Sequence, residues 1–165
     1  MVIGKLKRWT VDIRFWILLF FIVRLLAITN PPLEVAHNWR QTTVTMVARN
    51  FLETDNNILL PRIDIAGDKT GITGMEFPFL NYVIYLCSLV FGYEHWYGRL
   101  INLIVSSIGL YFFYQLIRKY FTKTLAFNAT YLLMLSVWFT YSRKIMPDTF
   151  SVSLGKLLRF ANRGS

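Results

Sequence analysis

The run LINLIVSSIGLYFFYQLI at Leu100–Ile117 is apolar over nearly its whole length and ends at the basic pair Arg118 and Lys119. A helix that crosses a bilayer needs roughly 20 predominantly apolar residues, a length that this run reaches with its flanks. Aromatic residues such as Trp96 and Tyr120 lie near its ends, as in the aromatic belts of membrane interfaces. The run therefore predicts a membrane-spanning helix.

Three other apolar stretches have the same character, and they lie at about 15–28, 77–91 and 125–141. The first follows a basic flank, as a cleaved signal peptide would, but it lacks a small-x-small cleavage site and ends at Asn30-Pro31-Pro32. We therefore interpret it as an uncleaved anchor. Together the stretches predict an all-α fold of polytopic membrane helices.

The charge distribution supports a membrane protein and disfavours a nucleic-acid binder. The chain of 165 residues is 55% hydrophobic and 17% aromatic, with a formal net charge of +9. The segment 31–76 holds six acids and four bases, and the other bases flank the apolar stretches rather than forming one hydrophilic face. We predict a multi-pass integral membrane protein, of the cytoplasmic (plasma) membrane if the source is bacterial, with its basic N-terminus in the cytoplasm and 31–76 exported.

One arginine interrupts the first apolar stretch. Arg24 is unfavourable in lipid by roughly 2.5–3.5 kcal/mol at mid-membrane. Two interpretations stay open, because the side chain can extend to the headgroups or face a polar cavity.

The exported loop 31–76 has an internal pattern of its own. From Asn38 to Glu53 one face carries Arg40 and apolar residues at helical spacing, and the other face is polar. The apolar residues are Val44, Val47, Ala48 and Phe51. The polar residues are Asn38, Thr42, Thr45 and Arg49. The remainder of the loop is rich in turn residues. We expect a structured extracytoplasmic loop that carries an amphipathic helix at the membrane surface.

Three polar groups on the exported side are candidates for chemistry, since the chain has no phosphate-binding glycine loop, no Cys/His metal cluster and no Gly-x-Ser-x-Gly motif. The candidates are the cluster Glu34, His37, Arg40 and Gln41, the motif Glu76-Phe77-Pro78, and Arg143 with Asp148 in Arg143-Lys144-Ile145-Met146-Pro147-Asp148.

The order of three short motifs carries a family resemblance. They are HNWRQTTVTMVARNF at 37–51, MEFPFL at 75–80 and YSRKIMPDTF at 141–150. Over Arg14 to Leu154 the chain resembles the N-terminal part of GT-C integral-membrane glycosyltransferases, in the branch of protein O-mannosyltransferases and lipid A aminoarabinose transferases. The resemblance implies a polyprenyl-phosphate-linked sugar as donor, membrane lipid as surroundings and transfer on the extracytoplasmic face.

The resemblance also assigns residues. The first acid of the family lies three positions before an Arg; here that Arg is Arg40, and His37 stands in place of the acid, with Glu34 as a substitute carboxylate. The second acid, which follows a Pro, matches Asp148. The Pro-containing start of the next helix matches Glu76-Phe77-Pro78.

The chemistry of sugar transfer points to the same residues. A phosphate-linked donor needs a base for the acceptor hydroxyl and positive charge on the leaving phosphate. Arg40 or Arg143 can bind the phosphate, and His37 or Asp148 can take the proton or hold a divalent cation, while Gln41 and Glu76 complete a polar cavity. The alternative roles are structural: a solvated or helix-capping His37, a headgroup anchor at Arg40, a topology signal at Arg143 and a helix cap at Asp148.

The topology decides whether these residues can meet. If all four stretches cross the membrane, Asp148 and His37 lie on opposite faces, and Arg118, Lys119 and Lys123 are exported against the positive-inside tendency. If 77–92 dips in without crossing, both conflicts disappear. Sixteen helical residues span only about 24 Å against a core of roughly 30 Å, although a tilted or thinned crossing is also allowed.

Two functional hypotheses follow. In the first, residues 1–154 are the N-terminal part of a glycosyltransferase module and 155–165 are a divergent or truncated tail. The chain is then a fragment without activity alone. The second is a small non-catalytic membrane protein that assists assembly or handles polyprenyl lipids. The sugar, the acceptor and the oligomeric state stay open.

Overall fold

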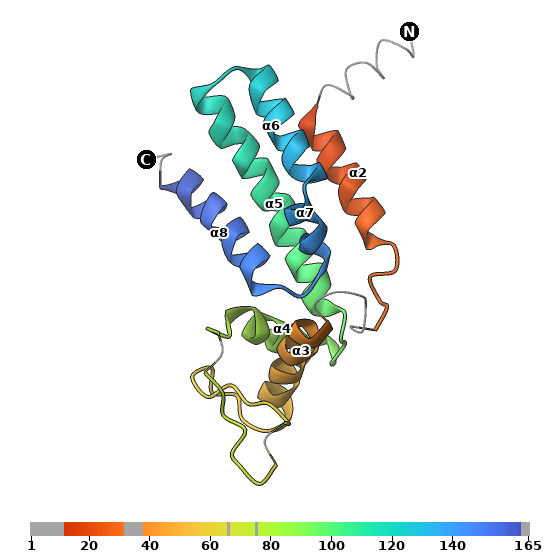
Figure 1. Cartoon of the computed structure of the whole chain (residues 1–165), viewed down its shortest axis with the longest axis vertical. Helices are drawn as coiled ribbons and strands as arrows, with labels where there is room; N and C mark the ends of the chain where they lie inside the picture. The colour runs from red at the N-terminus through yellow and green to blue at the C-terminus, as the bar shows by residue number, and fades with distance from the viewer. Residues whose placement is uncertain (1–11, 32–37, 66, 75, 163–165) are drawn as a thin grey trace.

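The computed structural model describes residues 12–31, 38–65, 67–74 and 76–162, which form helices joined by loops (Figure 1). This confirms the all-α fold; within these residues the β pairing is limited to one isolated bridge between Arg62 and Ile72. In chain order the elements are α2 (Ile13–Leu25), α3 (Asn38–Glu53), α4 (Phe79–Phe91), α5 (Tyr97–Tyr120), α6 (Lys123–Leu135), α7 (Val137–Thr140), the 3-10 helix η1 (Tyr141–Arg143) and α8 (Pro147–Ala161).

Helix α5 is the axis of the fold, and α2, α6 and α8 lie along it (Figure 1). The α5–α8 contact depends on a glycine, because a Cβ added at Gly109 would lie 2.9 Å from Ser153 Cβ and 3.1 Å from Ser153 Cα. The hydroxyl of Ser153 also lies 3.4 Å from that of Ser106. Small residues of this kind let two helix backbones approach closely.

Two side-chain caps begin the helices on the other side of α5. Asp12 caps α2 by accepting a hydrogen bond from the Arg14 amide at 3.0 Å. Thr122 caps α6 by accepting from the Leu125 amide at 3.3 Å. The two helices then pack through Trp16 and Tyr131, whose rings lie edge to face at 5.2 Å between centroids.

The expectation of one continuous helix over 125–141 is wrong, because the chain breaks at Ser136. This residue is extended, with ψ 156°, and α6 ends before it. Its hydroxyl donates to the Leu133 carbonyl at 2.6 Å and accepts from the Phe139 amide at 3.5 Å. A serine hydroxyl that satisfies backbone groups on both sides offers an alternative to the helical bonds, so a new turn, α7, starts here.

The amphipathic helix is confirmed, since α3 has the expected bounds and buries Val44, Val47, Ala48 and Phe51. Thr45 differs from the expectation: it belongs to the buried face rather than the polar one. Its hydroxyl donates to the Gln41 carbonyl within the same helix, so the side chain can be buried without an unsatisfied polar group.

Helix α4 lies with α3 at one end of α5 instead of running along the bundle (Figure 1). Its polar residues face inward. Asn81 is buried and donates to the Val44 carbonyl at 3.0 Å, while Val90 and Phe91 are exposed. Apolar residues such as Leu80 are buried as well, so α4 buries a mixed face and exposes an apolar one, as is typical of a helix with an apolar exterior environment.

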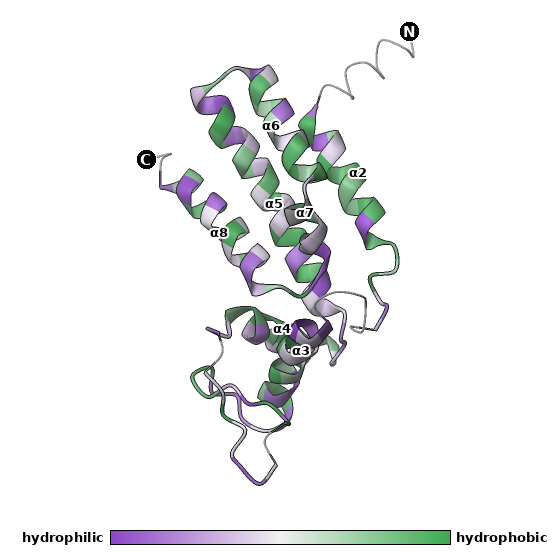
Figure 2. Ribbon diagram, in the orientation of Figure 1, coloured by the Kyte–Doolittle hydropathy of each residue, from purple (hydrophilic) through white to green (hydrophobic). Residues whose placement is uncertain are grey.

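Among the described helices, α5 alone is long and apolar enough to cross a membrane, with a mean hydropathy of 1.7. The stretch at 125–141 does not form a helix of spanning length, because α6 has only 13 residues. Helices α2 and α4 also have 13 residues each. Figure 2 shows apolar residues running along α2, α5 and α6 all the same. Helix α5 is thus one candidate span by length and composition, and the multi-pass topology stays a prediction.

Candidate functional site

The Arg40 guanidinium lies between two carboxylates that come from distant parts of the chain. Its Nη2 contacts Oε1 of Glu76 and lies 3.2 Å from Oδ2 of Asp148. Arg40 belongs to the first turn of α3, Glu76 to the segment before α4, and Asp148 to the first turn of α8. Water reaches all three, since the side chains are 35%, 38% and 70% exposed respectively. We call these residues the Arg40 cluster.

Asp148 owes its position to the way α8 begins. Met146 is extended and serves as the N-cap, and Pro147 is the first helical residue, which suits its restricted φ and its missing N–H. Asp148 therefore occupies the first turn, where the helix dipole favours a negative charge. The residue does not cap α8 with its side chain, so its carboxylate is available to Arg40.

Two buried amides hold the segment just before Asp148. Asn102 of α5 donates from Nδ2 to the Lys144 carbonyl at 2.6 Å and to the Met146 carbonyl at 3.4 Å. Gln41 of α3 accepts at Oε1 from the Ile145 amide at 3.3 Å. Both amide side chains are fully buried. The segment is thus held on one side by the bundle and on the other by the helix that carries Arg40.

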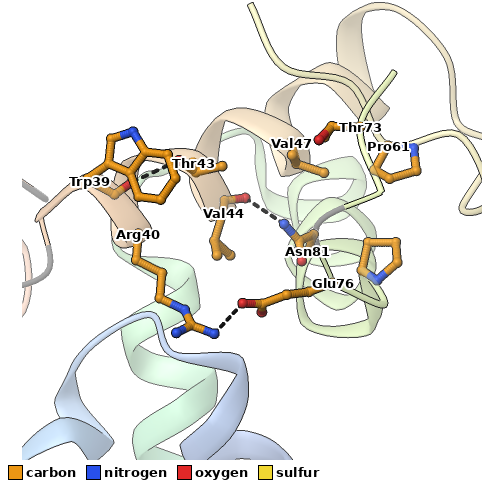
Figure 3. Close-up of a pocket in the computed structure, with 10 residues that line it drawn as sticks. Trp39, Arg40, Thr43, Val44, Val47, Pro61, Thr73, Glu76 and Asn81 are labelled. Atoms are coloured by element: carbon orange, nitrogen blue, oxygen red, sulfur yellow. Dashed lines mark hydrogen bonds and ion pairs between the residues drawn. The ribbon is translucent and has the colours of Figure 1, made fainter. Parts of the chain in front are cut away.

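A cavity of about 150 Å³ lies beside the Arg40 cluster, between α3, α4 and the loop that joins them (Figure 3). Arg40 and Glu76 point toward each other at one side of it, and Trp39 and Thr43 lie at another. The remaining lining residues are Val44, Val47, Pro61, Thr73, Pro78 and Asn81. We call this cavity the Trp39 pocket.

The structure brings some of the predicted site residues together, and others lie outside the residues that it describes. Arg40, Glu76 and Asp148 come together, and Gln41 lies next to them as a buried positioning group. Glu34 and His37 lie outside the described residues. Whether any of these residues acts in catalysis stays a prediction.

Two other arginines from the sequence analysis, Arg24 of α2 and Arg143 of η1, make contacts around the C-terminal end of α2. Arg143 donates from Nη2 to the Ala27 carbonyl at 3.2 Å. Arg24 donates from Nη1 to the Thr140 carbonyl at 3.3 Å, and its guanidinium lies over the Phe139 ring at 4.8 Å from the centroid. Carbonyls at helix ends carry partial negative charge, so this reciprocal arrangement joins α2 to the segment α7–η1.

The carboxylates near the pocket already have a cation partner in Arg40. Among the residues that the structure describes, no group of three or more His, Cys, Asp and Glu side chains is placed to hold a metal ion. A divalent cation at Asp148 therefore remains a prediction from the sequence, and the positive charge that the structure shows there is the guanidinium.

Sequence reasoning did not single out Asn102 or Trp39 as site residues. For Asn102 a signal existed, because an amide inside an apolar run is unfavourable unless it is hydrogen-bonded. For Trp39 the signal was only its place beside Arg40; that its indole borders a cavity depends on how α3 packs against α4.

The family comparison covers part of this site. A family model described as dolichyl-phosphate-mannose-protein mannosyltransferase matches residues 75–160, slightly more than half of the chain. The match includes Glu76, Asn102 and Asp148, and α3 with Arg40 precedes it. No curated protein and no solved structure matches the chain. The resemblance seen in the sequence is thus confirmed, and the chain belongs to the dolichyl-phosphate-mannose-protein mannosyltransferase family.

Proposed function

We propose that the Arg40 cluster is part of the active site of a membrane glycosyltransferase that takes a sugar from a polyprenyl-phosphate donor on the extracytoplasmic face. By its family, the chain is a glycosyltransferase-like membrane protein. The observation that carries the proposal is the water-accessible cluster of one arginine and two carboxylates drawn from three elements. It combines a cation for a phosphate with a base for a hydroxyl.

The proposed reaction is a displacement at the anomeric carbon of the donor sugar. The acceptor hydroxyl oxygen bonds to that carbon while the bond from the carbon to the phosphate oxygen breaks. The hydroxyl proton passes to the Asp148 carboxylate, and the leaving phosphate keeps the electron pair. Arg40 stabilises the charge that develops on the phosphate, since a guanidinium can donate two parallel hydrogen bonds to phosphate oxygens.

The ion pairs suggest how binding prepares the base. The Arg40–Asp148 pair is exposed and contributes little stability, so a donor phosphate can compete for the guanidinium. Asp148 is then released from its cation and free to accept a proton, while Glu76 keeps Arg40 oriented. In this proposal Arg143 is a second phosphate contact, and His37 and Glu34 are further candidates for the base.

We also propose a membrane arrangement in which residues 1–154 form the module and α3, α4 and their loop lie at its extracytoplasmic end. Three observations support it: α4 lies outside the bundle, its outward residues are apolar, and Asp148 lies at the same end as Arg40. The basic residues Arg118 and Lys123 lie near the opposite end of α5, as a cytoplasmic end requires.

The proposal is tested by lipid-phosphate binding to the full chain in nanodiscs, with undecaprenyl phosphate as the probe and native mass spectrometry as the readout. Arg40→Gln removes the proposed phosphate contact and should weaken binding about tenfold, the effect of losing one charge-assisted hydrogen-bond pair.

Arg49→Gln is the matched control. Arg49 also lies on α3 between two carboxylates, 3.6 Å from Glu53 and in contact with Asp64, but outside the Arg40 cluster. Equal binding by the two variants would contradict the proposal.

A further inference from the structure

We propose that the Trp39 pocket binds a pyranose ring of the acceptor, with the Trp39 indole as its platform. This inference rests on the proposed function, because it supplies the second substrate of the same site. It depends on the size of the pocket, the chemistry of its walls and its place in the fold.

The size of the pocket fits one six-membered ring. Its volume is about 150 Å³. Cavities of about 150 Å³ in other proteins accept a single benzene molecule. A pyranose ring has a similar width but carries hydroxyl and hydroxymethyl groups, so the ring can enter the Trp39 pocket while its substituents extend toward water.

The walls suit a ring that is apolar on its faces and polar at its edge. The Trp39 indole is 62% exposed and borders the pocket, and Val47 and Pro61 provide further apolar wall (Figure 3). The Glu76 carboxylate lies at the rim. The C–H bonds of a pyranose face carry partial positive charge and match the negative face of an indole, while the ring hydroxyls can donate to the carboxylate.

The hydroxyl groups of the pocket also favour a polar ligand. Thr43 and Thr73 line it, and the Thr43 hydroxyl donates to the Trp39 carbonyl at 2.9 Å, so its oxygen can still accept. A hydrocarbon chain in the same place would remove water from these hydroxyls and from Glu76 without replacing the hydrogen bonds. That is unfavourable by roughly 1–3 kcal/mol for each buried group, which argues against the polyprenyl tail as the occupant.

The place of the pocket points to the acceptor rather than the donor. All of its described lining residues belong to α3, to the loop after it, or to the start of α4. A polyprenyl donor is expected along the apolar outer faces of the bundle helices, such as α2 with Leu18, Ile22 and Val23 exposed. A ring bound on the far side of the Arg40 cluster can direct a hydroxyl toward Asp148 while the donor phosphate approaches Arg40 from the bundle.

The test uses the full chain in nanodiscs without any donor, and the methyl α-D-pyranosides of glucose, mannose, galactose and N-acetylglucosamine as probes. Binding is measured by saturation-transfer NMR and titrated. We expect at least one pyranoside to bind. Trp39→Ala should weaken its affinity about tenfold, consistent with the loss of one aromatic platform, and Trp39→Phe should restore most of it.

Leu59→Ala is the control, because Leu59 is an exposed apolar residue of the same loop that does not line the pocket. Absence of binding by all four pyranosides, or an unchanged affinity in Trp39→Ala, would overturn the inference. A Trp39→Ala variant that loses affinity for a polyprenyl-phosphate sugar but not for the free pyranoside would assign the pocket to the donor ring and overturn the acceptor assignment.

The outcome is separable from that of the proposed function. If Arg40→Gln leaves undecaprenyl phosphate binding intact while Trp39→Ala removes pyranoside binding, the catalytic proposal fails and the pocket assignment stands. The opposite pair of results retains the phosphate site and rejects the pocket.

Discussion

Nη2 of Arg40 lies 3.2 Å from Oδ2 of Asp148, although Arg40 lies in the first turn of α3 and Asp148 in the first turn of α8. A second link joins α3 to the segment just before α8, because Gln41 accepts from the Ile145 amide. Neighbouring residues on α3 thus contact the same short segment, one through charge and one through a buried neutral hydrogen bond. The buried bond holds the segment, and the exposed pair is left free to exchange partners.

Asp148→Asn should remove sugar transfer and leave the fold intact. The amide cannot accept the hydroxyl proton, so we expect a loss of at least about a hundredfold in rate, as for removal of a general base. The exposed ion pair contributes about 0–1 kcal/mol, so the free energy of unfolding should change by no more than that. Transfer from a polyprenyl-phosphate sugar and chemical unfolding measure the two effects, and unchanged transfer would reject Asp148 as the base.

Asn102→Leu should destabilise the start of α8. It leaves the Lys144 and Met146 carbonyls without their buried donor, an unfavourable change of about 1–3 kcal/mol. Ser107→Ala on the same helix is the control. The Ser107 hydroxyl donates to the Leu103 carbonyl within α5, so its loss does not affect the segment before α8. Chemical unfolding of the two variants compares them, and equal stabilities would show that Asn102 does not hold the segment.

Gly109→Ala should weaken the contact of α5 with α8. The new Cβ would lie 2.9 Å from Ser153 Cβ and 3.1 Å from its Cα, so the helices must separate, which is unfavourable by about 1–3 kcal/mol. Gly155→Ala is the matched helical control: no atom lies within 4 Å of its added Cβ, so it should stabilise α8 by about 0.5–1 kcal/mol. Changes of the same sign in thermal unfolding would contradict the packing argument.

The residues on either side of α4 should be accessible from the same side of the membrane. Cys87 is the sole cysteine, so a Cys87→Ser background allows single cysteines to be introduced at exposed sites. In sealed vesicles we expect Leu59→Cys and Glu94→Cys to react with an impermeant maleimide from one side, and Thr122→Cys from the other. Reaction of the Leu59 and Glu94 positions from opposite sides would show that α4 crosses.

Much of the helical structure could be predicted from local sequence. The amphipathic spacing over Asn38–Glu53 is contained within one helix, and α3 has those bounds. The apolar run that forms α5 likewise needed no information from the rest of the chain. The break at Ser136 was missed because hydropathy does not distinguish a serine that ends a helix from one that lies within it, and the distinction depends on the hydrogen bonds that its hydroxyl makes.

For the candidate site, the individual residues could be predicted from the sequence, but their convergence could not. Residue type and order indicated Arg40, Glu76 and Asp148 individually, since arginine and carboxylates are the groups that phosphate and hydroxyl chemistry requires. Their convergence could not be derived, because it needs α4 to leave the bundle and α8 to return along α5. The role of Asn102 could not be predicted either, because it depends on the Lys144–Met146 segment lying beside α5.

The sequence by itself thus determined α5, the bounds of the amphipathic helix α3 and the family, because these depend on side chains within a few turns of one another. Only the tertiary structure decided which charges meet and which surfaces enclose a cavity. The reason is physical: the close approach at Gly109 and the buried hydrogen bonds of Gln41 and Asn102 join residues that are distant in the chain, and helix periodicity carries no information about such contacts.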